Sequence, residues 1–156
     1  MFVGLLAAAL LAMPGAVQAA GGGKPVRVLF ICEHGVAKSL VAARFFERMA
    51  GERGVRASVV SRGVVPERSV PATLVANVAR DGFAVSGFQP QKLSAADLRS
   101  ADRVIAFNLD VAAPKGVTVE RWDVPALSDD YPVARDAIVA RLSALLDRLS
   151  AAAAAK

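Results

Sequence analysis

The stretch that decides the fold is residues 26–39, which read VRVLFICEHGVAKS. Its first six residues are apolar except for Arg27, and a nearly continuous apolar run of this length is typical of a strand covered on both faces. Ser39, the last residue, is a good N-cap for a helix. Apolar residues then recur at helical spacing, namely Leu40, Ala43, Phe46 and Ala50. We therefore expect a strand, a tight loop and a helix in direct succession.

Strand and helix patterns alternate along the rest of the chain. Three more strands are predicted, over 57–61, 102–107 and 117–122. Three more helices are predicted, over about 70–80, from Ser94 with Asp97 placed for a capping box, and over about 133–149. This alternation predicts an α/β fold with a parallel sheet between layers of helices. Ligands of such folds bind beyond the carboxyl ends of the strands.

The first twenty residues carry no charged side chain. Their apolar stretch, 2–13, is too short to span a bilayer comfortably, and the small residues of Val17-Gln18-Ala19 lie at the positions that a signal peptidase reads. We expect a signal peptide without a basic n-region over 1–20, an α/β domain over 21–150 and an alanine-rich tail over 151–156. The expected location is periplasmic or secreted. The alternative is a cytoplasmic protein with an apolar N-terminal tail.

The chain has one cysteine, Cys32, and one histidine, His34. This excludes an internal disulfide and a structural zinc site built from these two residue types. The net charge is +5 from basic residues that form no run, which favours anionic ligands in a general way. We expect no cofactor, no metal and no nucleic-acid partner, and membrane contact only through an uncleaved leader. The sequence does not indicate an oligomeric state.

Residues 32–39 have the chemistry that an anion-binding loop needs. A tight loop between a strand end and a helix start turns several backbone N–H groups towards one point. Gly35 permits a positive φ and Lys38 supplies a cation. The same surroundings stabilise a thiolate, to which Ser39 can donate, so Cys32 is the candidate nucleophile. The expected anion-binding residues are Glu33, His34, Gly35, Val36, Ala37 and Lys38.

This segment resembles the low-molecular-weight protein tyrosine phosphatases and the arsenate reductases that share their fold. Their signature is Cys-x5-Arg-Ser after a buried strand. Residues 122–125, Trp-Asp-Val-Pro, precede the last helix, where the family has its Asp-Pro loop. The resemblance implies a three-layer α/β/α fold with a four-stranded parallel sheet and a phosphocysteine intermediate. The expected ligand is phosphate, arsenate or a phosphorylated substrate.

Two positions depart from the family pattern. Lys38 stands where the family has an arginine, and a point charge cannot bind phosphate bidentately, a loss of about 2–4 kcal/mol in transition-state binding. Ala126 stands at the natural match for the family's acid, an aspartate before a proline. Asp123, Asp129 and Asp130 lie nearby, and Asp129 is the candidate acid. His34 is a second group that could help to protonate a leaving group.

Three functions are therefore considered. The preferred one is a phosphomonoester hydrolase acting through Cys32. The second is a non-catalytic oxyanion-binding module, which Lys38 and Ala126 would suit. The third is an arsenate reductase, which would need an external thiol because the chain has no second cysteine, and an exported protein meets little thiol reductant.

Overall fold

The computed structural model describes residues 23–155, so the expected signal peptide lies outside the described residues. The described part contains the strands β1 (Val26–Cys32), β2 (Ala57–Gly63), β3 (Arg103–Phe107) and β4 (Val119–Trp122). Its helices are α1 (Lys38–Glu52), α2 (Ala72–Arg80), α3 (Ala95–Ser100) and α4 (Tyr131–Ala154). None of these helices is long and apolar enough to cross a bilayer.

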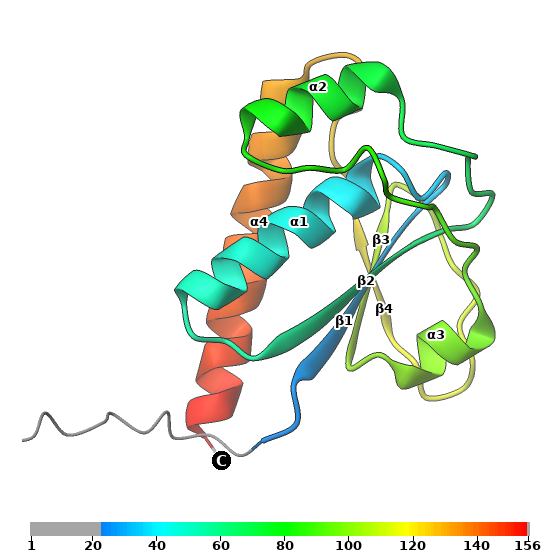
Figure 1. Cartoon of the computed structure of the whole chain (residues 1–156). Coiled ribbons are helices and arrows are strands. Elements are labelled where there is room, and N and C mark those ends of the chain that lie inside the picture. Colours follow the sequence, from blue (N-terminus) through cyan, green and yellow to red (C-terminus); the bar gives the residue numbers. More distant parts are fainter. Residues whose placement is uncertain (1–22, 156) are drawn as a thin grey trace, which may run out of the picture.

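The four strands form one parallel sheet in the order β2-β1-β3-β4. Helices α1 and α4 pack on one face, with α2 beside them, and α3 covers the other face, which gives three layers (Figure 1). The expected fold class is thereby confirmed. Both β1 and β3 are central strands, and because they are parallel their carboxyl ends lie at the same edge of the sheet.

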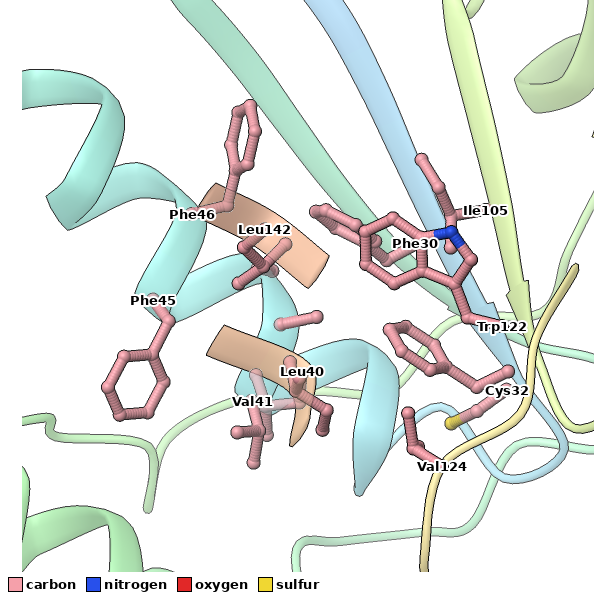
Figure 2. Packing of buried hydrophobic residues seen from close by; sticks show 14 of the residues in the cluster. Phe30, Cys32, Leu40, Val41, Phe45, Phe46, Ile105, Trp122, Val124 and Leu142 are labelled. Atoms are coloured by element: carbon pink, nitrogen blue, oxygen red, sulfur yellow. The ribbon is translucent and has the colours of Figure 1, made fainter. Parts of the chain in front are cut away.

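Strand β1 is covered on both faces, as its apolar run predicts. Val28 and Phe30 belong to the core cluster under α1 and α4, whereas Leu29 and Ile31 belong to the smaller cluster under α3. Figure 2 shows the larger cluster, with Cys32 at its loop end. The strand that carries the nucleophile candidate is therefore fixed from both sides.

The element boundaries differ from the predicted ones by a few residues. Strand β2 runs on to Gly63 because this residue still pairs with Cys32 of β1. Strand β4 begins at Val119, since Val117 closes a turn by donating its N–H to the carbonyl of Pro114. Helix α4 begins at Tyr131 and continues through Ala154, so the alanine run is mostly a helical extension.

The predicted capping box at the start of α3 is present. The Ser94 hydroxyl accepts from the N–H of Asp97 at 3.1 Å, and the carboxylate of Asp97 accepts from the N–H of Ser94 at 3.0 Å. The second carboxylate oxygen of Asp97 pairs with Arg62 of β2 at 3.1 Å. One carboxylate thus caps α3 and ties it to the end of β2.

Asp97→Asn should destabilise the protein by about 1–2 kcal/mol at pH 7, because it removes a charged cap and the partner of Arg62. Burial opposes ionisation here, but hydrogen bonds from Ser94 and Arg62 outweigh it, so the pKa of Asp97 is lowered. A lowered folded-state pKa adds stability above the unfolded pKa, and this is lost as the pH falls through the folded pKa. Urea unfolding of both proteins should therefore show a difference that shrinks in acid.

Asp147→Asn is the matched control, because Asp147 pairs with Arg53 on the surface and its side chain is 72% exposed. This change should cost less than about 1 kcal/mol at any pH. An Asp97→Asn effect of the same size as the control would contradict the assignment of Asp97 as a cap.

Candidate active site

The loop that joins β1 to α1 lies at the carboxyl edge of the sheet, where the sequence predicts the ligand site. The segment after β2 supports it through three backbone hydrogen bonds. The carbonyls of Cys32, Glu33 and His34 accept from residues 64, 65 and 67 at 3.2, 2.8 and 3.1 Å. These hydrogen bonds therefore fix the conformation of the loop.

Two glycines allow this support. Gly35 has a φ of +69°, as its place in the loop predicts. A Cβ atom added to Gly35 would lie 2.8 Å from the backbone nitrogen of Gly63, and one added to Gly63 would lie 2.8 Å from the nitrogen of Gly35. The two backbones pack directly on each other. The sequence points to Gly35, but the need for Gly63 emerges only from the fold.

The Cys32 sulfur has two hydrogen-bond donors. The N–H of Gly35 donates to it at 3.2 Å, and the Ser39 hydroxyl lies 3.0 Å away. Ser61 of β2 donates to the Ser39 oxygen at 2.9 Å, which leaves the Ser39 proton for the sulfur. All three side chains are buried, with Cys32 5% exposed. These contacts fix the position of the sulfur in the buried site, where it can serve as a nucleophile.

Ser39 is not the N-cap that the sequence predicts. Helix α1 begins at Lys38, two residues earlier than a Ser39 cap would place it, with Ala37 at the N-cap position and no side chain capping it. Ser39 lies inside the first turn because its hydroxyl is used in the buried contacts to Cys32 and Ser61. The first turn also contains no acidic residue. The amino end of α1, with its partial positive charge, therefore faces the loop without a capping group from its own sequence.

Lys38 connects the loops that follow three strands. Its ammonium donates to the Asn108 side-chain oxygen after β3 at 2.6 Å and to the Val124 carbonyl after β4 at 3.2 Å. Burial lowers the pKa of Lys38 from its ordinary value, partly offset by the negative charges of Cys32, Asp123 and Asp129. The predicted cation thus stands beside the predicted nucleophile, with hydrogen bonds that fix its direction.

A pocket of about 510 Å³ lies over this loop. It brings together five of the residues named from sequence, Cys32, Glu33, His34, Ala37 and Lys38. Gly35 and Val36 do not line it, and the Val36 side chain is buried. Sequence reasoning missed the rest of the lining. It comes from the loop after β2 and from the end of β3 with the loop that follows it, namely Val64, Val65, Phe107, Asn108, Leu109 and Asp110.

The candidate acids occupy different places. Asp129 does not line the pocket, although its charge acts on Lys38. Asp130 caps α4 by accepting from the N–H of Val133 at 3.1 Å, and Asp123 pairs with Arg121 at 2.9 Å. Asp110 lines the pocket and was not foreseen. The acid role of Asp129 stays a prediction. Asp110 is a further carboxylate that the structure places at the pocket.

His34 lies at the rim of the pocket with its side chain about half exposed. Its Nδ1 atom is 3.3 Å from the Val65 carbonyl, and the carboxylates of Glu33 and Glu67 lie 3.8 and 4.0 Å from the ring nitrogens. The ring is thus held beside the pocket mouth rather than turned away from it. Its part in proton transfer stays a prediction.

The chain is similar to known proteins in sequence profile and in fold. The profile of the low molecular weight phosphotyrosine protein phosphatases matches residues 27–121. A search of curated proteins found no match. Among solved structures, a low molecular weight protein tyrosine phosphatase from Bacillus subtilis superposes with a TM-score of 0.69 and 20% identity, over 80% of this chain and 97% of that one.

Arsenate reductases superpose with slightly lower TM-scores. The thioredoxin-dependent enzyme of Corynebacterium glutamicum gives a TM-score of 0.66 and 22% identity over 83% of this chain, which spans only 64% of that protein. The enzyme of Archaeoglobus fulgidus gives 0.64 and 24% over 77% of this chain and 98% of that one. At these identities the superpositions establish the shared fold.

Proposed function

Since the chain belongs to the low molecular weight phosphotyrosine protein phosphatase family, we propose that it is a phosphomonoester hydrolase whose nucleophile is Cys32. One observation carries the proposal. Cys32 lines the pocket and its sulfur has donors from Gly35 and Ser39, in the loop that leads into the uncapped amino end of α1. A sulfur nucleophile, converging N–H groups and a cation are the parts that phosphoryl transfer requires.

The proposed reaction has two steps. The Cys32 thiolate attacks phosphorus, so that an S–P bond forms while the bond to the leaving oxygen breaks, and that oxygen takes a proton from an acid. Water then gives a proton to the conjugate base of that acid and attacks phosphorus, so that a P–O bond forms, the S–P bond breaks and phosphate leaves, while Ser39 donates to the thiolate that returns. Asp129 is proposed as the acid. Lys38 and the backbone N–H groups of 33–37 would stabilise the charge on the equatorial oxygens.

Two other functions have some support. The fold shared with arsenate reductases favours oxyanion chemistry, and arsenate has the shape and charge of phosphate. Reduction would require an external thiol, because Cys32 is the chain's one cysteine. A non-catalytic oxyanion-binding module is favoured by Lys38, whose ammonium lacks the planar fork of arginine.

We also propose that residues 1–20 direct export, so that the site would meet substrates outside the cytoplasm. The support is the uncharged apolar stretch that ends at Pro14 and Gly15, followed by small residues.

Purified full-length protein should hydrolyse p-nitrophenyl phosphate, with competitive inhibition by phosphate and by vanadate. Turnover should be roughly 10²–10³-fold lower than in the same loop with arginine at position 38, because lysine at this position loses about 2–4 kcal/mol of transition-state binding. Steady-state release of p-nitrophenol measures this. Phosphate binding without hydrolysis would instead support the binding module, and arsenate-dependent oxidation of an added thiol would support the reductase.

A further inference from the structure

Three loops of the candidate site meet at Asn108. This residue follows β3 directly and lines the pocket. Its side-chain oxygen accepts from the Lys38 ammonium at 2.6 Å and from the Val124 N–H at 3.3 Å, while its own N–H donates to the Trp122 carbonyl at 3.0 Å. Since both side-chain partners are donors, the oxygen end of the amide must face them.

The backbone restricts which residue types suit this position. Asn108 has a φ of +58°, in the left-handed region that glycine, asparagine and aspartate tolerate best. Of these three, glycine has no side chain to hold Lys38. Aspartate would hold it as an ion pair and cancel its charge. Asparagine alone holds the ammonium with a neutral acceptor.

The other described groups around Lys38 also leave its ammonium without a negatively charged hydrogen-bond partner. Its second acceptor, the Val124 carbonyl, is also neutral. Within residues 23–155 no carboxylate forms an ion pair with Lys38, although Asp123 and Asp129 are near enough for their charges to act on it. Asp123 is instead paired with Arg121 at 2.9 Å. No described carboxylate therefore neutralises the Lys38 ammonium by direct pairing.

We propose that Asn108 is a positioning residue that directs the Lys38 ammonium to the pocket while leaving its charge available to a bound oxyanion. The proposal rests on the proposed function, because it concerns the same site. A lysine side chain is flexible and binds as a point charge, so its usefulness depends on where other groups hold it. Asn108 fixes the direction of the ammonium, whereas the planar guanidinium of an arginine is directional by its own geometry.

The first test is a thermodynamic cycle of phosphate binding, measured by titration calorimetry on the full chain. Asn108→Gly suits the left-handed backbone and removes only the side chain. It should weaken phosphate binding about three- to ten-fold when Lys38 is present. In a Lys38→Met background the same change should alter affinity less than about two-fold, because the group that it positions is gone.

The second test uses the pH dependence of phosphate affinity. Burial lowers the pKa of Lys38, so wild-type affinity should fall at alkaline pH as the ammonium loses its proton. Asn108→Asp places a carboxylate against Lys38, which favours the charged form and should move this fall to higher pH. At pH 7 the variant should bind phosphate about ten-fold more weakly or worse, because the pair is neutralised.

Asn77→Asp is the matched control, since Asn77 of α2 contacts Arg80 and does not line the pocket. It makes the same change of charge and should leave phosphate affinity and its pH profile unaltered. Thermal unfolding checks that every variant is folded.

An equal loss on Asn108→Gly in the wild-type and Lys38→Met backgrounds would overturn the proposal. So would an alkaline fall at the same pH in wild type and Asn108→Asp. Binding is measured without turnover, so failure of the hydrolase assignment would show separately in the p-nitrophenyl phosphate assay.

Discussion

Replacing Cys32 by serine is expected to reduce p-nitrophenyl phosphate turnover at least about 10⁴-fold. A serine hydroxyl is a far weaker nucleophile than a cysteine sulfur, so the unchanged contacts from Gly35 and Ser39 would not restore the attack on phosphorus. The change is nearly isosteric in a buried position. The fold and the loop should therefore persist, and stability should change little.

The assay compares steady-state rates of Cys32→Ser and wild type, with phosphate affinity measured beside it. The variant should still bind phosphate, since Lys38 and the backbone N–H groups are unchanged. Ser58→Ala is the control and should keep wild-type turnover. Ser58 lies in β2 near its amino end, far along the strand from the residue that pairs with Cys32. Turnover that survives Cys32→Ser would remove the sulfur from the mechanism.

The second large effect is expected for Gly35→Ala. The new Cβ would lie 2.8 Å from the Gly63 nitrogen and 3.0 Å from its Cα, and neither atom belongs to a flexible side chain. Either the loop or the end of β2 must move. We expect a loss of about 10²–10³ in kcat/KM from the misplaced loop, and a destabilisation of about 2–4 kcal/mol.

Gly54→Ala separates the contact from the backbone strain. Gly54 has nearly the same φ, +67°, but a Cβ there would meet no atom within 4 Å. This control should cost about 1 kcal/mol in urea unfolding and leave kcat/KM unchanged. If Gly35→Ala lost no more activity and stability than Gly54→Ala, the backbone packing of Gly35 on Gly63 would not matter for the site.

Much of the fold could be predicted because local patterns and tertiary burial agree. The run in β1 is buried on both faces, and the stripe of α4 that contains Ile138 and Leu142 lies in the core. The capping box of Ser94 and Asp97 was also visible, because it depends on residues only three apart. Boundaries such as the start of α1 were less predictable, since they follow from contacts across the sheet.

The site could be predicted only where it lies in one segment. Cys32, Lys38 and Gly35 share a single loop, so spacing was enough to find them. Asn108 and Asp110 come from a loop about seventy residues later, brought to the pocket by the parallel pairing of β1 with β3. A polar residue directly after a buried strand was the one signal that could have indicated Asn108.

The Ser39 assignment shows how two roles can compete for one residue. Its place before an apolar helical pattern indicates an N-cap, but the loop also brings its hydroxyl within 3.0 Å of the Cys32 sulfur. The contacts to Cys32 and Ser61 decide between them, and a β2 residue such as Ser61 is not adjacent in sequence. The amino end of α1 is consequently left for a ligand to satisfy.

The most direct measurement of the central claim is chemical trapping of the intermediate. Full-length protein mixed with p-nitrophenyl phosphate is quenched in acid within the first turnovers, digested, and analysed by mass spectrometry. The account predicts that the peptide containing Cys32 gains the mass of one phosphoryl group, on sulfur, and that Cys32→Ser shows no such turnover-dependent modification. Continued hydrolysis with Cys32 unmodified, or with the phosphoryl group on another residue such as His34, would contradict it.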